Sequence, residues 1–211
     1  MRTRSKLLLA GLTATVALWA AVGAADAKRL ELSERAIRAT WAEFTLTDTS
    51  LFKSVCPITI EGSFHSRTLS KVSGQLVGYI TAATTNKGGC KSEFRFLSLW
   101  FDENGIANLP WHIRYDSFTG TLPAITGVRL QLIGMGVKFE GTTCEYLSEV
   151  ALPAYLRLLL EAGRVTTVQW EEGTRIRRIN GACLERGQVA GNGQLRVQGT
   201  TATSITIRLV A

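Results

Sequence analysis

The sequence is poor in the residues and motifs that most often support catalysis. Only two of its 211 residues are histidines, His65 and His112. After the N-terminal segment, the sequence lacks four familiar motifs. These are the G-x-S-x-G nucleophile elbow, the phosphate-binding P-loop, the H-E-x-x-H zinc motif, and the S-x-x-K pair together with its companion motifs. The hydrolases, nucleotide-binding proteins and zinc proteases that depend on these motifs are therefore excluded.

Other absences bear on the fold and on metal binding. The spacings C-x-x-C and H-x-x-x-H are missing, so we expect neither a metal site nor a cofactor. Long amphipathic helices between strands are also missing, which excludes a doubly wound α/β fold. The chain shows no internal repeat, low-complexity linker or composition shift that would mark a domain boundary. We expect a single domain.

The N-terminus has the pattern of an export signal. Basic residues occupy positions 2, 4 and 6, an apolar run covers 7–22, and Ala25-Asp26-Ala27 supplies the small residues of a cleavage site. A transmembrane anchor is the alternative, but the run is shorter than the ~20 residues that cross a bilayer. We predict that residues 1–27 are a signal peptide, that 28–211 form the mature protein, and that it is secreted or held at the cell surface without a stable membrane span.

The charge of the mature chain argues against one class of partner. The formal charge of the whole chain is +7, and the predicted signal carries three basic residues and Asp26, so +5 remains. This excess is mild and spread along the chain, whereas a nucleic-acid groove requires clustered basic residues. We therefore expect no nucleic-acid partner, and at most a weak attraction to acidic polymers.

The cysteines predict the covalent framework. All four lie in the mature chain, at Cys56, Cys90, Cys144 and Cys183. An even number in an oxidising compartment indicates two disulfides, for which three pairings are possible. The sequence favours Cys56 with Cys90 and Cys144 with Cys183, because each bond would then close a locally contiguous hairpin region.

Alternation of apolar and polar residues is the dominant pattern. From Cys56 to His65 the apolar residues occupy even positions, which is typical of a half-buried strand. Further strands are expected at 75–84, 93–101, 110–119, 127–139, 164–171, 174–179, 183–190, 194–198 and 203–210, and a strand is favoured over a helix between 30 and 49. Asn-Gly pairs at 104–105, 180–181 and 192–193 predict hairpin turns. The expected fold is all-β, a single-domain antiparallel β-sandwich or barrel.

One helix is expected near 153–162. Pro153 suits a first helical position, the following residues are good helix formers, and Gly163 suits the position just past the end.

Two alternating stretches supply the candidate site residues. Trp111, Ile113 and Tyr115 would share one face of a strand and point into the core. The polar residues that we group as a candidate cluster are Glu61, His65, His112, Arg114 and Asp116. His112 and Asp116 cannot pair within one strand, because residues four apart are separated by about 13 Å. If strands 56–65 and 110–118 are neighbours, the cluster forms across them; a solvated polar face is the simpler interpretation.

The segments CPITIEGSFHSRTLSKVSGQLVGYI and LPWHIRYDSFTGTLPAITGVRLQLIG, starting at residues 56 and 109, carry a resemblance. Together with the predicted signal and the two later cysteines, they resemble a group of small exported bacterial proteins without an assigned function. The resemblance implies an exported, disulfide-bearing β domain, and it implies no catalytic residue, cofactor or substrate.

We therefore expect a non-enzymatic extracellular binding or structural module. Its partner would be a cell-surface polymer or glycan, for which Trp41, Trp100, Trp111 and Trp170 could form a stacking platform. The alternatives are an extracellular hydrolase built on the candidate cluster and a small outer-membrane barrel, which would require a lipid-facing apolar band.

Overall fold

The computed structural model describes residues 29–48, 53–91, 97–99, 109–122, 124–139, 142–200 and 204–210. The predicted signal peptide, Trp100 and the Asn104-Gly105 turn lie outside these residues. The strands are β1 (Arg29–Leu32), β2 (Ala36–Thr47), β3 (Lys53–Phe64), β4 (Thr68–Leu69), β5 (Leu76–Thr85), β6 (Leu97–Leu99), β7 (Trp111–Thr121), β8 (Ala124–Ile133), β9 (Gly136–Phe139), β10 (Glu145–Leu147), β11 (Ala154–Glu161), β12 (Arg164–Trp170), β13 (Arg175–Asn180), β14 (Arg186–Val197) and β15 (Ile207–Val210).

Eight strands close into a ring because β14 pairs with β2 and with β12. The order around the ring is β12–β11–β8–β7–β5–β3–β2–β14, and the circuit is completed where Val168 and Trp170 of β12 face Gly193 and Gly191 of β14. All of these pairings are antiparallel. The predicted all-β antiparallel fold is confirmed, with a closed ring as its main body.

Alternating side chains fill the inside of the ring. In β3, Ile58, Ile60 and Phe64 point inward and are at most 3% exposed, as the alternation of apolar and polar residues predicted. Inward residues from all eight strands meet in the same way, and the void left between them is only about 20 Å³. A void of this size holds about one water molecule. The interior is therefore a packed apolar core and not a ligand chamber.

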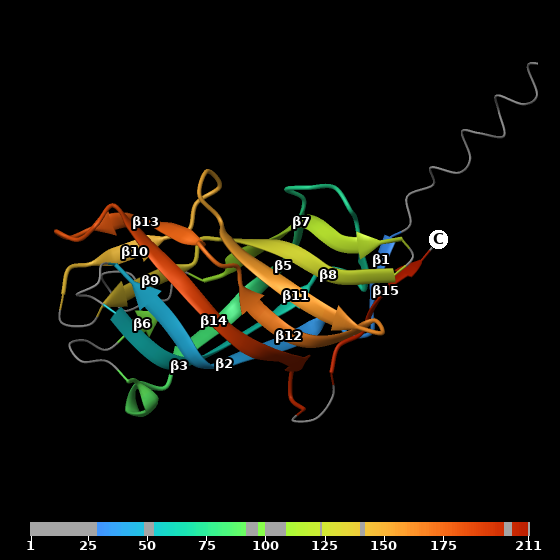
Figure 1. Ribbon diagram of the computed structural model, residues 1–211, viewed down its shortest axis with the longest axis horizontal. Coiled ribbons are helices and arrows are strands. Elements are labelled where there is room, and N and C mark those ends of the chain that lie inside the picture. The colour runs from blue at the N-terminus through green and yellow to red at the C-terminus, as the bar shows by residue number, and fades with distance from the viewer. Residues whose placement is uncertain are drawn as a thin grey trace, which may run out of the picture.

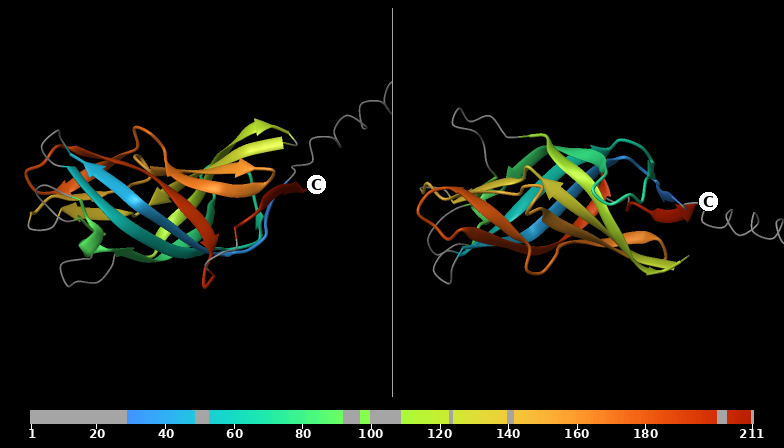
Figure 2. Two further views of the ribbon diagram at one scale, coloured as in Figure 1. Left: turned by 60° about the horizontal axis from the view of Figure 1, so that its bottom comes forward. Right: turned by 90° about the horizontal axis from the view of Figure 1, so that it is seen from above.

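Two smaller groups of strands extend the ring at opposite ends (Figure 1). β14 continues beyond the ring to pair with β13, and β10, β9 and β6 follow in that order. At the other end, β1 pairs with β15 and β4. All three views place β15 at the same end as the tip of the β7–β8 hairpin (Figure 2). The molecule is consequently elongated along the direction of the strands.

The two disulfides tie turns to this framework. Cys56 of β3 is bonded to Cys90, which follows the single-turn 3-10 helix η2 (Lys87–Gly89). Cys144, just before β10, is bonded to Cys183 in the turn between β13 and β14. The pairing is the one that the sequence favoured. An oxidised domain with two disulfides is compatible with an extracellular location.

The prediction of a helix at 153–162 is wrong, because this segment forms strand β11. Leu156, Leu158 and Leu160 are buried in alternation with half-exposed residues, and β11 pairs with both β8 and β12. The Ala162-Gly163 pair is a two-residue hairpin turn in which both φ angles are positive, at 47° and 77°. Local helix propensity contributes only a few tenths of a kcal/mol per residue. The pairing of β11 with a neighbouring strand on each side outweighs this preference.

Two strand boundaries also differ from the prediction. The stretch 127–139 is divided into β8 and β9 at Gly134, whose φ of 85° breaks the ladder. In contrast, the two strands predicted at 183–190 and 194–198 are merged into one, β14, which begins only at Arg186 and runs to Val197, and Asn192-Gly193 is no hairpin turn. A Cβ atom at Gly193 would collide with the Thr40 carbonyl oxygen and the Trp41 ring. Gly193 is thus required by the close approach of strands at the point where the ring closes.

Among the described residues, no helix has the length and hydrophobicity needed to cross a lipid bilayer.

Candidate functional site

The candidate cluster predicted from the sequence is divided in the structure. Its two strands, β3 and β7, are not neighbours, because β5 lies between them. Glu61 on β3 contacts Arg38 at 3.5 Å and accepts a hydrogen bond of 3.0 Å from Gln198. Asp116 on β7 has a different set of partners. The five residues therefore do not form one site.

The two imidazoles contact the same tyrosine ring. Tyr79 of β5 lies between them, with ring centroids 4.9 Å from His65 and 5.3 Å from His112. Within the described ranges, no side chain hydrogen-bonds to either imidazole. The hydrolase alternative requires a histidine paired with a carboxylate or a hydroxyl, and the described residues supply no such pair.

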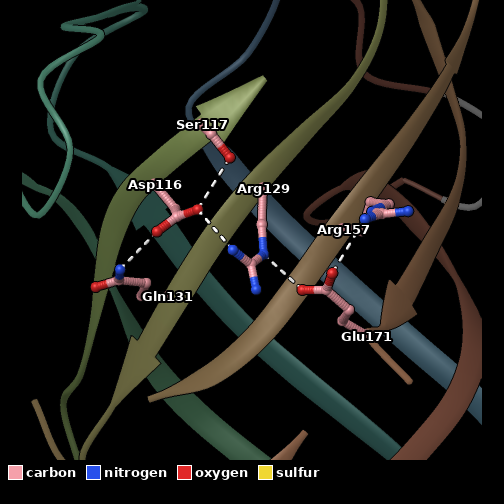
Figure 3. Close-up of polar contacts among 6 residues, drawn as sticks. All are labelled: Asp116, Ser117, Arg129, Gln131, Arg157 and Glu171. Atoms are coloured by element: carbon pink, nitrogen blue, oxygen red, sulfur yellow. Dashed lines mark hydrogen bonds and ion pairs between the residues drawn. The ribbon is translucent and has the colours of Figure 1, made fainter. Parts of the chain in front are cut away.

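Asp116 belongs instead to a polar network on the outside of the ring (Figure 3). Its Oδ1 accepts a 2.7 Å hydrogen bond from Gln131. Its Oδ2 accepts bonds of 3.1 Å from the Arg129 guanidinium and 2.9 Å from the Ser117 hydroxyl. Only 13% of the Asp116 side chain is exposed. This carboxylate is held in a fixed orientation by three donors from β7 and β8.

Glu171, just after β12, extends the network to two arginines (Figure 3). Its carboxylate accepts a 2.5 Å bond from Arg129 and a 3.0 Å bond from Arg157. Arg129 and Arg157 are direct cross-strand partners on β8 and β11, so their like charges face each other. The shared carboxylate compensates that repulsion, since opposite charges stabilise and like charges destabilise neighbouring strands.

Arg129 is the centre of this network. Its guanidinium lies 3.7 Å from the centroid of the Tyr155 ring, close enough for a cation–π interaction. Burial by itself lowers the pKa of Arg129, but the hydrogen bonds and charges of Glu171 and Asp116 outweigh it, so the pKa is raised. Arg129 therefore stays charged, with both its position and its orientation fixed.

The network borders a surface hollow of about 330 Å³. Asp116, Phe118 and Lys71 line it, and the Lys71 ammonium lies 5.7 Å from the centre of the Phe118 ring. Arg114 lies on the same outer side of β7, directly opposite Gln131. Its Nε is buried and has no hydrogen-bond partner among the described residues. We call the surface formed by Lys71, Arg114, Asp116, Arg129, Tyr155, Arg157 and Glu171 the charged face.

Sequence reasoning identified only part of the charged face. Arg114 and Asp116 were candidates, whereas Arg129, Arg157 and Glu171 were not selected. The alternation in Gly127-Val-Arg-Leu-Gln-Leu-Ile places Arg129 and Gln131 on a common outer side, and this signal could have been used. Arg157 lies in the segment that was expected to be a helix, so its outward position on a strand was not anticipated.

The tryptophans that the structure describes do not form the stacking platform expected for a glycan. Trp41, Trp111 and Trp170 are each 1% exposed. Trp41 and Trp170 pack against each other in the core, with ring centroids 5.5 Å apart. These residues provide core volume and offer no flat ring to a ligand.

Asp48 and the Cys144–Cys183 disulfide bring three potential metal-ligating atoms within 4.8 Å of one another. Both sulfurs are bonded in the disulfide, so neither is a thiolate, the form that binds metal ions. Asp48 Oδ1 accepts a 3.1 Å bond from the Leu184 amide. Nearby, burial and the hydrogen bond and charge of Asp48 raise the pKa of Tyr146. In the oxidised protein this group is a structural polar cluster.

No protein-family model matches the sequence, and no curated protein or solved structure matches it significantly. The resemblance to small exported bacterial proteins accordingly remains a prediction.

Proposed function

We propose that this chain is an exported, non-enzymatic binding module, and that its charged face binds an acidic glycan of the cell surface. The observation that carries the proposal is the arrangement of Arg114, Arg129 and Arg157. They lie at outward positions on three neighbouring strands, β7, β8 and β11. Planar guanidinium groups bind carboxylate and phosphate groups through two parallel hydrogen bonds, which makes them suited to acidic polymers.

The charge balance of this surface supports an anionic ligand. The charged face has four cationic side chains and two carboxylates, Asp116 and Glu171. The carboxylates bind Arg129 and Arg157, whereas the described residues offer Arg114 and Lys71 no ion-pair partner. We infer that Arg114 and Lys71 make the direct contacts with the ligand and that Arg129 maintains the surface.

Aromatic rings flank the cationic groups. Tyr155 lies under Arg129, and Tyr79 with its two histidine neighbours continues the same outer surface across β5 and β3. Tyrosine presents both an apolar ring and a hydroxyl, so it can contact a sugar ring and hydrogen-bond to its substituents. Such a mixture of rings and guanidinium groups favours a glycan over a simple anion.

The two alternative functions lack comparable support. The described residues place no carboxylate beside His65 or His112, so a hydrolase has no identified acid–base pair. A membrane-inserted domain would require an apolar outer surface. The outward side chains of β7, β8 and β11 instead include the ion-paired Asp116, Arg129 and Arg157.

Binding of polygalacturonate, a carboxylate polymer, to the mature oxidised protein tests the proposal, with dextran as the neutral control. We expect polygalacturonate to bind in 50 mM NaCl and to bind less tightly in 300 mM NaCl, because salt screens exposed charges. Arg114→Gln should weaken binding at least fivefold. Arg38→Gln, the same change on β2, should leave binding unchanged. Equal losses for both variants, or equal binding of dextran, would refute the proposal.

A further inference from the structure

A second, uncharged hollow lies on a different part of the ring. Its volume is about 400 Å³, and it is lined by residues of β2, β3 and β5 together with the turn that follows β5. This volume falls within the range of small-ligand sites, which is about 300–1,000 Å³. The hollow shares no residue with the charged face, and its role does not depend on the function proposed above.

Threonine hydroxyls form a row across the hollow. Thr40 is the direct partner of Thr59, and Thr59 is the direct partner of Thr84, so the three side chains lie on the same outer side of adjacent strands. Neighbouring strands are about 4.8 Å apart, which sets the spacing of the row. Among the described residues, none hydrogen-bonds to any of these three hydroxyls. The row therefore offers several free donors and acceptors to a ligand.

The remaining lining complements the threonines. Asn86 adds an amide that both donates and accepts, and Pro57 adds an apolar ring. The Thr85 hydroxyl oxygen is buried beside them, without a hydrogen-bond partner in the described part of the chain. None of the residues that line the hollow is charged. Its chemistry fits a ligand with many hydroxyl groups and no net charge.

The hollow is built into the framework. A bulge in β2 shifts the register between Trp41 and Phe44, and it places the small side chain of Ala42 at the rim. On the opposite side, the backbone N–H of Asn86 donates to the Pro57 carbonyl, and the Cys56–Cys90 disulfide anchors the turn that follows. The walls are therefore fixed before any ligand arrives, which reduces the entropy cost of binding.

We propose that this hollow is a binding site for a neutral saccharide. Thr40, Thr59, Thr84 and Asn86 would hydrogen-bond to its hydroxyl groups, and Pro57 would contact the apolar side of a sugar ring. The absence of a cation among the lining residues distinguishes this site from the charged face. It predicts that a carboxylate on the sugar weakens binding, since a buried carboxylate would have no partner.

NMR titration of the ¹⁵N-labelled mature, oxidised protein with cellotetraose, maltotetraose and chitotetraose tests this site. At least one of them should shift the amide resonances of Thr40, Thr59 and Asn86, in contrast to tri-galacturonate. Thr59→Val keeps the shape of the side chain and removes its hydroxyl, so it should weaken that binding about five- to tenfold. Thr166→Val is the same change at an exposed position of β12 outside the hollow, where the hydroxyl donates to the Leu159 carbonyl, and it is the control.

Three results would overturn the proposal. These are no shift with any of the three oligosaccharides, shifts that map outside the hollow, and equal effects of Thr59→Val and Thr166→Val. Thermal unfolding of both variants verifies that they fold. Because Arg114→Gln alters only the charged face, it should leave the saccharide titration unchanged, so failure of one site is distinguishable from failure of the other.

Discussion

Replacing Glu171 by glutamine tests whether one carboxylate holds two opposed arginines together. In the structure this carboxylate accepts bonds from Arg129 at 2.5 Å and from Arg157 at 3.0 Å. The change Glu171→Gln removes the negative charge but keeps the size of the side chain. The amide can still accept one bond, but its NH₂ group faces the second guanidinium, and the two arginines then repel each other directly.

The expected loss follows from burial. Opposite charges about 4 Å apart attract by roughly 4 kcal/mol at the effective dielectric constant of a protein surface. The side chains of Glu171, Arg129 and Arg157 are 25%, 29% and 37% exposed. Solvent screening therefore reduces the net contribution well below this value, because fully exposed pairs contribute about 0–1 kcal/mol. We expect Glu171→Gln to lower the free energy of unfolding by about 1–2 kcal/mol.

Urea unfolding at 25 °C in low salt measures this loss, and Glu61→Gln is the matched control. Glu61 faces Arg38 at 3.5 Å, and the Arg38 side chain is 48% exposed. The control should therefore cost less than about 0.5 kcal/mol. The double variant Glu171→Gln/Arg157→Gln should lose less free energy of unfolding than the sum of the two single variants, because removing Arg157 also removes its repulsion of Arg129. Equal losses at positions 171 and 61, or strict additivity, would refute the reasoning.

Three further predictions concern stability. Replacing Cys56 and Cys90, or Cys144 and Cys183, by alanine should each cost about 4 kcal/mol in urea unfolding, because the closed loops span 34 and 39 residues; losses below about 1 kcal/mol would contradict the chain-entropy argument. Leu158→Ala should lower the free energy of unfolding by about 2–5 kcal/mol, whereas Leu159→Ala should lower it by less than about 1 kcal/mol, because only Leu158 points into the ring. The opposite order would contradict the assignment of this segment to a strand. Burial raises the pKa of Tyr146 in the folded protein, so the stability that this group contributes is complete below pH 10, the usual tyrosine pKa, and is lost as the pH rises toward the pKa of the folded state. Tyr146→Phe should therefore flatten the decline of the urea midpoint between pH 9.5 and 11, and an unchanged slope would assign the decline to other groups.

The sequence predicts best where local pattern and tertiary environment agree. From Cys56 to Phe64, β3 follows a two-residue period, and the apolar side chains at its even positions, Cys56, Ile58, Ile60 and Phe64, lie in the core as expected. The Asn180-Gly181 pair marks the hairpin between β13 and β14, where Gly181 has a φ of 87°. In these places the residues nearest in the chain decide the structure, so the pattern alone is sufficient.

Prediction failed where distant segments decide the outcome. The residues of β11 are good helix formers, yet β8 and β12 provide pairing on both sides, and only the folded chain brings these strands together. Asn192-Gly193 has the composition of a turn, but it lies where β2, β12 and β14 converge. Local composition does not contain the position of those partners.

The amino-acid pattern by itself determined the strand-rich character of this protein, the inward residues of most strands and the favoured cysteine pairs. These properties follow from side-chain periodicity and from the sequence distance between cysteines. The tertiary structure alone decided three other properties. These are the closure of the ring, the separation of β3 from β7 by β5, and the contact among Asp116, Arg129, Arg157 and Glu171. Their physical reason is strand order, because hydrogen bonding between strands far apart in the sequence selects which outward side chains become neighbours.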